Sequence, residues 1–284
     1  MEINELIKIG VDSIKGRLYS NPMLEATLLL SKLMKVDKVY IYTHGKDRVP
    51  DEIVEEYMKA VEKRSKGYPI QYIIKEKEFM GLDFYIEEGV LIPRPDTEVI
   101  VEYILAYIDK NHPNENIKVL DIGIGSGAIG LSVAYYRKNT YVYGVDISPE
   151  ALKVAGINRD RFKLTNVKLL ESNLFERIDK EEKFHIIASN PPYIPTDSID
   201  SLQEEVKDYE PRIALDGGKE GMEFYKRIVP ESKEYLQERG LLIFEIGFDQ
   251  GRAVEDLMIA EGFKDVKILK DLQGLDRAVL GIKG

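Results

Sequence analysis

The sequence contains no cysteine and no tryptophan, and it has only three histidines among its 284 residues. The absence of cysteine excludes disulfide bonds and thiolate metal sites. The histidines, His44, His112 and His185, are scattered along the chain and do not have the spacing of zinc ligands. We therefore expect no metal centre.

Long apolar runs and a secretion signal are missing as well. No apolar stretch approaches the roughly 20 residues that a membrane-spanning helix needs. The first residues, MEINELIKIG, lack the basic region followed by an apolar stretch that marks a signal peptide. These absences predict a cytoplasmic enzyme or binding protein that does not act at a membrane.

An excess of positive charge is also absent. Lys and Arg number 40 and Asp and Glu number 50, which gives a net charge of −10. A protein that holds long stretches of nucleic acid needs a Lys or Arg for each phosphate contact. The charge therefore disfavours stable binding to DNA or RNA, although a local basic patch is compatible with it.

Residues 1–74 have the pattern of a helical domain, and the chain is long enough for about two domains. Glu25–Met34 is a strong helix-forming stretch with apolar residues nearly all round, which is typical of the central helix of a small bundle. Residues 75–93 follow, with aromatic and apolar side chains around Gly81, and predict a β-hairpin linker.

Residues 94–284 alternate between short apolar strands and helices. This order predicts a catalytic or binding domain of the α/β class, with a doubly wound, mostly parallel seven-stranded sheet covered on both faces and one late antiparallel strand. The expected strands are Lys118–Ile122, Tyr141–Asp146, Val167–Glu171, His185–Ser189, Leu241–Ile246, Asp265–Leu269 and Arg277–Ile282.

A glycine-rich turn follows the first expected strand. Gly125, Gly127 and Gly130 match the dinucleotide fingerprint, so a nicotinamide enzyme is one alternative. Asp121 argues against it, because this carboxylate and a pyrophosphate would repel each other by roughly several kcal/mol in a partly desolvated pocket. The same carboxylate suits the ammonium group of S-adenosylmethionine. The residues expected to hold that cofactor here are Asp121, Gly123, Ile124, Gly125, Ser126 and Gly127.

The ends of the second and third expected strands carry polar side chains. Asp146 can accept hydrogen bonds from both ribose hydroxyls of an adenosine, and Ile147 can pack on the adenine. The alternative is that Asp146 only caps the helix that follows. Asn173, beside Leu174, stands where a polar side chain can reach the adenine edge.

The fourth expected strand ends in SNPPYIP, residues 189–195. Pro191 and Pro192 stiffen the backbone, and Asn190 offers an amide oxygen while Pro191 offers a free carbonyl. Tyr193 offers a flat face for stacking. These parts suit a planar amide or amine whose hydrogens are held by two acceptors, so that charge developing on its nitrogen during alkylation is stabilised. The alternative is a proline-rich loop without chemistry.

These motifs together resemble the class I methyltransferases that act on planar nitrogens of adenine, guanine or glutamine. Flanking segments narrow the resemblance to the HemK/PrmC-type release factor glutamine methyltransferases. Pro93-Arg94-Pro95 favours them over the relatives that methylate a ribosomal protein glutamine, which typically have Pro-Arg-Ser there. The other segments are Arg64–Ile73, Phe79–Phe84, Val90–Glu98, Tyr209–Arg212, Ala214–Gly218, Gly221 and Asp271–Arg277.

The resemblance implies the reaction and the partners. The methyl donor would be S-adenosylmethionine, which becomes S-adenosylhomocysteine, and the acceptor would be the glutamine of the GGQ motif in peptide chain release factors 1 and 2. Asn190–Tyr193 would hold the glutamine amide, with Asn190 also beside the cofactor, and residues 1–74 would dock the substrate. Asn173 departs from the Asp that many members carry.

Three points stay open at this stage. The chain could instead methylate nucleic acid or a ribosomal protein, or it could be a non-catalytic module that keeps the fold. In each case we expect a monomer. Arg94 either contacts a ligand or ties its segment to the catalytic domain. The acidic stretch Thr196–Glu210 is either a solvated connection or a surface for a basic partner domain, which would involve Glu204, Glu205 and Asp208.

Overall fold

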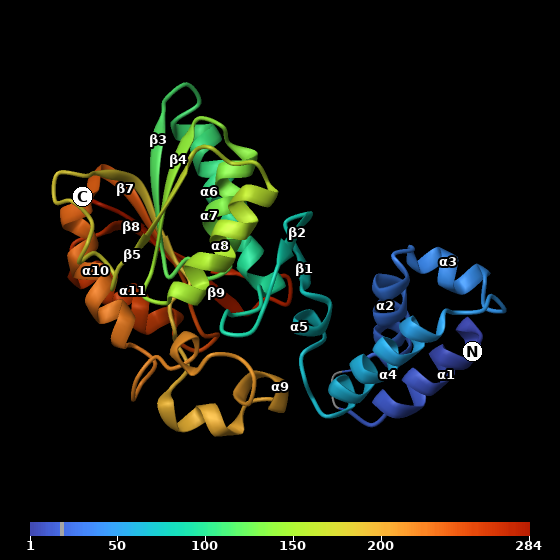
Figure 1. Ribbon diagram of the computed structural model, residues 1–284. Coiled ribbons are helices and arrows are strands. Elements are labelled where there is room, and N and C mark those ends of the chain that lie inside the picture. The colour runs from blue at the N-terminus through green and yellow to red at the C-terminus, as the bar shows by residue number, and fades with distance from the viewer. Residues whose placement is uncertain (18–19) are drawn as a thin grey trace. The chain divides into compact units, whose positions relative to one another are not determined.

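The structure is a computed structural model that describes residues 1–17 and 20–284 (Figure 1). The chain forms two compact units. The first consists of Met1–Glu76 and Gln203–Tyr209, and the second of Lys77–Leu202 and Glu210–Gly284. Within the described residues, no helix combines the length and the apolarity that crossing a membrane requires.

The first unit is helical, and α2 is its central helix. Asn21 caps α2 through a 3.2 Å hydrogen bond from the Leu24 amide to Oδ1, and Pro22 opens the helix. The apolar residues of α2 pack against α1, α3, α4 and α5, as its all-round apolar pattern predicted. The helices of this unit are α1 (Ile3–Ile14), α2 (Pro22–Met34), α3 (Lys38–Thr43), α4 (Asp51–Ser65), α5 (Ile70–Ile74) and α9 (Glu204–Lys207).

The second unit contains a seven-stranded sheet in the order β5-β4-β3-β6-β7-β9-β8. The first five strands in this order pair in parallel, and β9 is antiparallel to both neighbours, which confirms the predicted α/β architecture. The strands are β3 (Ile117–Ile122), β4 (Thr140–Asp146), β5 (Val167–Glu171), β6 (Phe184–Ser189), β7 (Leu236–Glu245), β8 (Lys264–Lys270) and β9 (Asp276–Ile282).

Helices cover both faces of this sheet. The central strands β3 and β6 are buried along almost their whole length, which explains why they are continuous apolar runs. Figure 1 shows α6, α7 and α8 on one face and α10 and α11 on the other. The bounds are α6 (Glu98–Asn111), α7 (Ala128–Tyr136), α8 (Pro149–Arg161), α10 (Glu223–Tyr235) and α11 (Gly251–Ala260).

The strand order creates a crevice at one edge of the sheet. From β3 the chain proceeds to β4 and β5 on one side, and β6 then returns to the other side of β3. At such a switch point the loops beyond the carboxyl ends of neighbouring strands diverge, which leaves space for a ligand. The glycine-rich turn follows β3 and the SNPPYIP stretch follows β6, so both lie at this edge.

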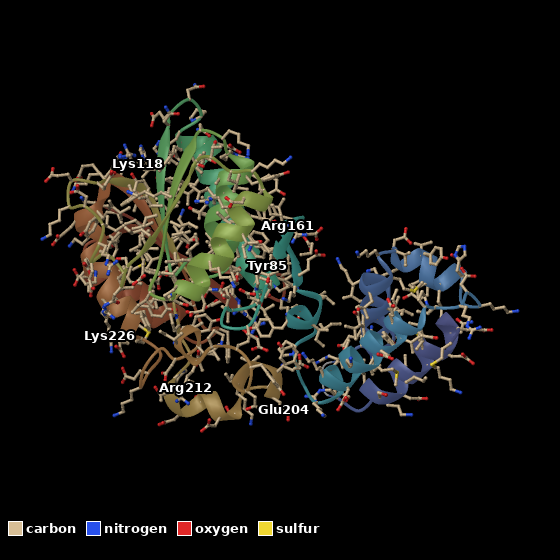
Figure 2. All side chains as sticks on the ribbon, in the orientation of Figure 1. Tyr85, Lys118, Arg161, Glu204, Arg212 and Lys226 are labelled. Carbon is tan, nitrogen blue, oxygen red and sulfur yellow. The ribbon has the colours of Figure 1, made fainter. Side chains whose placement is uncertain are left out.

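The expected hairpin is formed by β1 (Glu76–Phe79) and β2 (Leu82–Tyr85), and from Lys77 onward it belongs to the second unit. The rings of Phe84 and Phe162 lie 4.9 Å apart. Asn158 of α8 accepts a 2.6 Å hydrogen bond from the Tyr85 amide and donates a 3.0 Å bond to the Tyr85 carbonyl. Tyr85, which Figure 2 labels, belongs to β2. These contacts hold the hairpin against α8.

The segment 203–209 leaves the second unit and packs with the first. Glu204 forms an ion pair with Arg17 at 2.6 Å, and Glu205 forms one with Arg64 at 2.7 Å. Two of the three acidic side chains that the sequence suggested for a basic partner are therefore already paired with arginines of this chain.

Candidate active site

A cavity of about 360 Å³ opens at the carboxyl edge of the sheet, entirely within the second unit. The turns after β3, β4, β5 and β6 line it, together with the segment before α6 and part of α10. Most of the site residues predicted from the sequence line this cavity: Asp121, Gly123, Ile124, Gly125, Ser126, Asp146, Ile147, Asn173, Leu174, Asn190, Pro191 and Pro192.

The glycine-rich turn is held by the neighbouring strand. The amides of Gly123 and Ile124 donate to the Val145 carbonyl at 2.8 and 2.9 Å. Gly123 and Gly125 have φ angles of 71° and 56°, which favour glycine and bring the bare backbone to the cavity.

Gly127, which the sequence predicts to bind the cofactor, is not among the residues that line the cavity. It begins α7 with a φ of 93°, and a Cβ there would lie 2.4 Å from Leu131 Cδ1. Its glycine is thus required by the turn geometry and by close packing. Gly130, the last glycine of the fingerprint, is explained similarly, since a Cβ there would lie 2.8 Å from an oxygen of Asp121.

Asp121 is a buried carboxylate at the end of β3, with 1% of its surface exposed. Its Oδ2 accepts a 2.8 Å hydrogen bond from the Gly130 amide. Burial raises the pKa of Asp121 to about 7, the Gly130 bond opposes this shift, and the charge of Asp146 adds to it. The site therefore carries an acidic group that a cationic ligand would stabilise in its ionised form.

Asp146 joins two backbone segments of the cavity. Its Oδ2 accepts from the Gly125 amide and its Oδ1 from the Ser148 amide, both at 2.9 Å. The cap of α8 is Ser148, whose Oγ accepts from the Ala151 amide at 3.2 Å. Capping is thus not the role of Asp146, and its carboxylate remains at the cavity beside Ile147, whose side chain is half exposed.

Asn173, which follows β5, has hydrogen-bond partners within the protein that the sequence did not indicate. Asn173 Oδ1 accepts a 3.2 Å hydrogen bond from Arg227, and Asn173 Nδ2 donates one of 2.6 Å to Glu176. Sequence reasoning missed Arg227 and its neighbour Phe224, which line the cavity from α10. The amphipathic pattern of α10 offered no signal that marked these two side chains.

The stretch after β6 brings three of its four predicted residues to the cavity. Asn190, Pro191 and Pro192 line it, whereas Tyr193 does not. The Tyr193 hydroxyl donates to Glu245 Oε1 at 3.1 Å. Burial, and then the charge of Glu245, raise the pKa of Tyr193, so its hydroxyl stays protonated.

A second loop packs closely against this stretch. The Ile194 amide donates to the Leu215 carbonyl at 3.0 Å, and the Gly217 amide donates to the Ile194 carbonyl at 2.8 Å. A Cβ on Gly217 would lie 2.7 Å from Tyr193 Cα and 2.8 Å from the Pro192 carbonyl oxygen. Only glycine permits this approach, which accounts for the ALDGG segment.

Arg94 ties its segment to the catalytic domain, and its contact with a ligand stays a prediction. It lines the cavity, and its Nη2 donates to Glu210 Oε1 at 2.5 Å. Glu210 is buried and also accepts a 3.4 Å hydrogen bond from the Ile92 amide. Arg94 thus anchors the segment before α6 while it remains at the cavity wall.

Comparison with known proteins identifies the family. Two family models match the chain: the PrmC N-terminal domain over residues 5–74 and a methyltransferase domain over residues 113–245. The crystal structure of a methyltransferase from Pyrococcus furiosus has a TM-score of 0.54 at 21% identity and covers 72% of this chain and 90% of that one. At this identity the likeness concerns the fold, which is that of a methyltransferase as predicted.

Two relatives align over nearly the whole chain. The release factor glutamine methyltransferase of Clostridium acetobutylicum is 44% identical over 264 residues, which cover 92% of each chain. That of Clostridium botulinum is 40% identical over 282 residues, which cover 98% of each chain. The methyltransferase match also decides against a nicotinamide enzyme. The chain therefore belongs to the release factor glutamine methyltransferase family.

Proposed function

We propose that this enzyme transfers a methyl group from S-adenosylmethionine to the side-chain amide nitrogen of the GGQ glutamine in peptide chain release factors 1 and 2. The names of its relatives support this substrate. The observation that carries the proposal is that Asn190 and Pro191 line the same cavity as the glycine-rich turn and Asp146. The enzyme would act in the cytoplasm as a monomer, without stable binding to nucleic acid.

The residues of the cavity fit this methyl donor. Asp121 supplies negative charge for the ammonium group, and the backbone of Gly123 and Gly125 permits close approach of the methionine end. Asp146 has lone pairs left for the ribose hydroxyls, and Ile147 offers an apolar surface to the adenine. When bound, S-adenosylmethionine supplies an electrophilic methyl group.

The acceptor end of the cavity suits an amide. Asn190 Oδ1 and the Pro191 carbonyl can accept the two hydrogens of the glutamine NH2, which directs the nitrogen lone pair at the methyl group. The two acceptors also stabilise positive charge that builds on the nitrogen in the transition state. The alkylated nitrogen is acidic enough to release a proton to water, so no strong base is needed. The sequence also predicts that the Tyr193 ring stacks on the amide, although Tyr193 is not among the residues that line the cavity.

Labelled methyl transfer tests this proposal. Purified enzyme receives methyl-labelled S-adenosylmethionine with unmodified release factor, or with a copy whose GGQ glutamine is changed. We expect label in the first and none in the second. Label in neither, with cofactor bound, would reject the substrate and direct the search to RNA and DNA. Label in both would place the methyl group on another residue.

The variant Asn190→Ala tests the predicted acceptor. We expect kcat to fall by about a hundredfold or more, because one preorganised group at the reacting nitrogen is lost. Asn111→Ala is the matched control, since Asn111 donates its side-chain hydrogen bond to the Tyr107 carbonyl at an exposed position of α6. That control should retain the wild-type kcat in the same methylation assay. Equal rates for the two variants would remove Asn190 from the reaction.

A further inference from the structure

A buried carboxylate that sequence analysis did not assign to the site lies behind the acceptor residues. Glu245 ends β7, next to β6 in the sheet, and only 1% of its surface is exposed. Both of its oxygens accept hydrogen bonds from hydroxyl groups: Oε2 from Thr97 and Oε1 from Tyr193. One side chain thus holds a group from the segment before α6 and a group from residues 189–195, the active-site loop.

Thr97 connects this carboxylate to Asn190. The Thr97 side chain is 3% exposed and lines the cavity. Its Oγ1 donates to Glu245 and lies 3.5 Å from Asn190 Nδ2. Glu245, Thr97 and Asn190 therefore form a chain of hydrogen bonds that ends at the proposed acceptor group.

The direction of these bonds follows from their chemistry. An ionised carboxylate only accepts hydrogen bonds, so the single hydrogen of the Thr97 hydroxyl is committed to Glu245. The Thr97 oxygen can then only accept from Asn190, and it does so from the NH2 end of the amide. The other end, Oδ1, is left for the NH2 group of the substrate.

The surroundings of Glu245 bear on its charge. Burial raises the pKa of Glu245, whereas the Thr97 hydrogen bond, the positive charge of Arg277 and the Tyr193 hydrogen bond oppose that shift. Asp96 acts in the same direction as burial. The net shift of the Glu245 pKa is upward, and the two hydroxyl donors and the nearby guanidinium limit it by stabilising the ionised form.

We infer that Glu245 and Thr97 are positioning residues that fix the orientation of the Asn190 amide, so that its oxygen rather than its nitrogen faces the substrate, while Glu245 also anchors Tyr193. This inference rests on the proposed function. It differs from a packing role, because it requires the polarity of the Thr97 hydroxyl and not only its volume.

The experiment compares Thr97→Val, Thr97→Ser and Glu245→Gln. Valine keeps the shape of Thr97 without the hydroxyl, and serine keeps the hydroxyl without the methyl group. We expect Thr97→Val and Glu245→Gln to lower kcat by about tenfold to a hundredfold. Thr97→Ser should recover most of that loss. The Kd of S-adenosylhomocysteine, measured by calorimetry, should change less than about twofold in each.

A matched control separates this effect from the loss of any buried hydroxyl. Thr140 is also 3% exposed, and its hydroxyl donates to the Arg137 carbonyl at the opposite edge of the sheet. Thr140→Val should retain the wild-type kcat. The double variant Thr97→Val with Glu245→Gln should be no slower than the slower single variant, because both changes break one chain.

A spectroscopic readout does not depend on turnover. The side-chain NH2 signals of Asn190, assigned by their loss in Asn190→Asp, should shift in Thr97→Val and in Glu245→Gln, and stay in place in Thr140→Val. Unshifted signals together with a wild-type kcat in Thr97→Val would overturn the inference. An inactive wild-type enzyme would instead reject the proposed function, and shifted Asn190 signals would then still support the positioning.

Discussion

At the scale of single residues, the site depends on two carboxylates whose pKa values are raised by burial. Asp121 has one backbone donor and almost no solvent contact, so its pKa rises to about 7. Burial also raises the pKa of Asp146, but hydrogen bonds from the Ser148, Gly125 and Ile147 amides counter it. Asp121 is consequently the group whose charge a bound cation should change most.

Cofactor binding should therefore depend on pH through Asp121. Below pH 7 this carboxyl is increasingly protonated, and a neutral group attracts an ammonium ion less. The affinity for S-adenosylhomocysteine should rise by up to about tenfold per pH unit from pH 5.5 toward 7, a range in which the ligand ammonium stays charged. Calorimetry in buffers across this range measures the slope.

Asp121→Asn provides the control for that slope. The variant should bind more weakly at pH 7, with an affinity that changes little over the same range. If the variant keeps the full slope, the titrating group is a different one, and Asp146 is the first candidate.

At the scale of elements, the active-site loop is held by the loop of residues 215–221 through contacts that leave no room for a side chain. The backbone of Tyr193 and Pro192 meets Gly217, and Gln250 Nε2 donates to the Tyr193 carbonyl at 2.9 Å. The prolines alone stiffen the chain locally, but these contacts fix where the stiff segment lies.

Gly217→Ala should displace the active-site loop. The new methyl group meets backbone atoms that cannot rotate away, so kcat should fall by about tenfold or more while cofactor binding is largely kept. Gly156→Ala on α8 is the matched control, because its Cβ would meet only Leu169 Cδ1, at 3.9 Å. That helix substitution should raise stability by about 0.5–1 kcal/mol and leave kcat unchanged. Comparable rates for both variants would contradict the role of the loop contact.

At the scale of the whole molecule, the chain divides into two units, and the first is completed by a segment from far along the sequence. Arg64 is 2% exposed, and it donates to both oxygens of Glu25 on α2, at 2.6 and 3.1 Å. It also pairs with Glu205 of α9 at 2.7 Å. One guanidinium thus joins the helical bundle to residues 203–209.

Removing this guanidinium should destabilise the first unit. Arg64→Met keeps most of the side-chain volume but leaves two carboxylates without their partner. We expect the free energy of unfolding of this unit to fall by about 3 kcal/mol. This is the lower end of the cost of breaking a buried ion pair, because Glu205 is 26% exposed and can be partly hydrated. Urea denaturation followed by far-ultraviolet circular dichroism measures this change. The helical signal of the variant should be lost at a lower urea concentration than that of the wild type.

The control for that change is Lys66→Met. Lys66 pairs with Glu62 at 2.7 Å, but both side chains are about two-thirds exposed. We expect no measurable change in the helical transition, since exposed ion pairs contribute little. An equal shift in both variants would mean that the burial of Arg64 is irrelevant.

The sequence alone located the strands of the sheet and the two turns that carry the predicted site residues. Apolar runs located all seven strands. The exception in length is β7, which begins at Leu236 rather than at Leu241, because its first residues are mostly polar and pair with β6 in an irregular register. The glycines and prolines marked the two turns, because their constraints act within a few residues. These local signals do not depend on knowing the fold.

The tertiary structure decided which distant groups meet. Thr97 and Glu245 are 148 residues apart in the chain, and Arg64 and Glu205 lie on separate segments of one unit. Only the folded sheet also brought the Tyr193 hydroxyl to Glu245 and Gly217 to the backbone of Tyr193. A local pattern cannot specify these partners, because each contact is selected by the packing of strands and helices that are remote in the sequence.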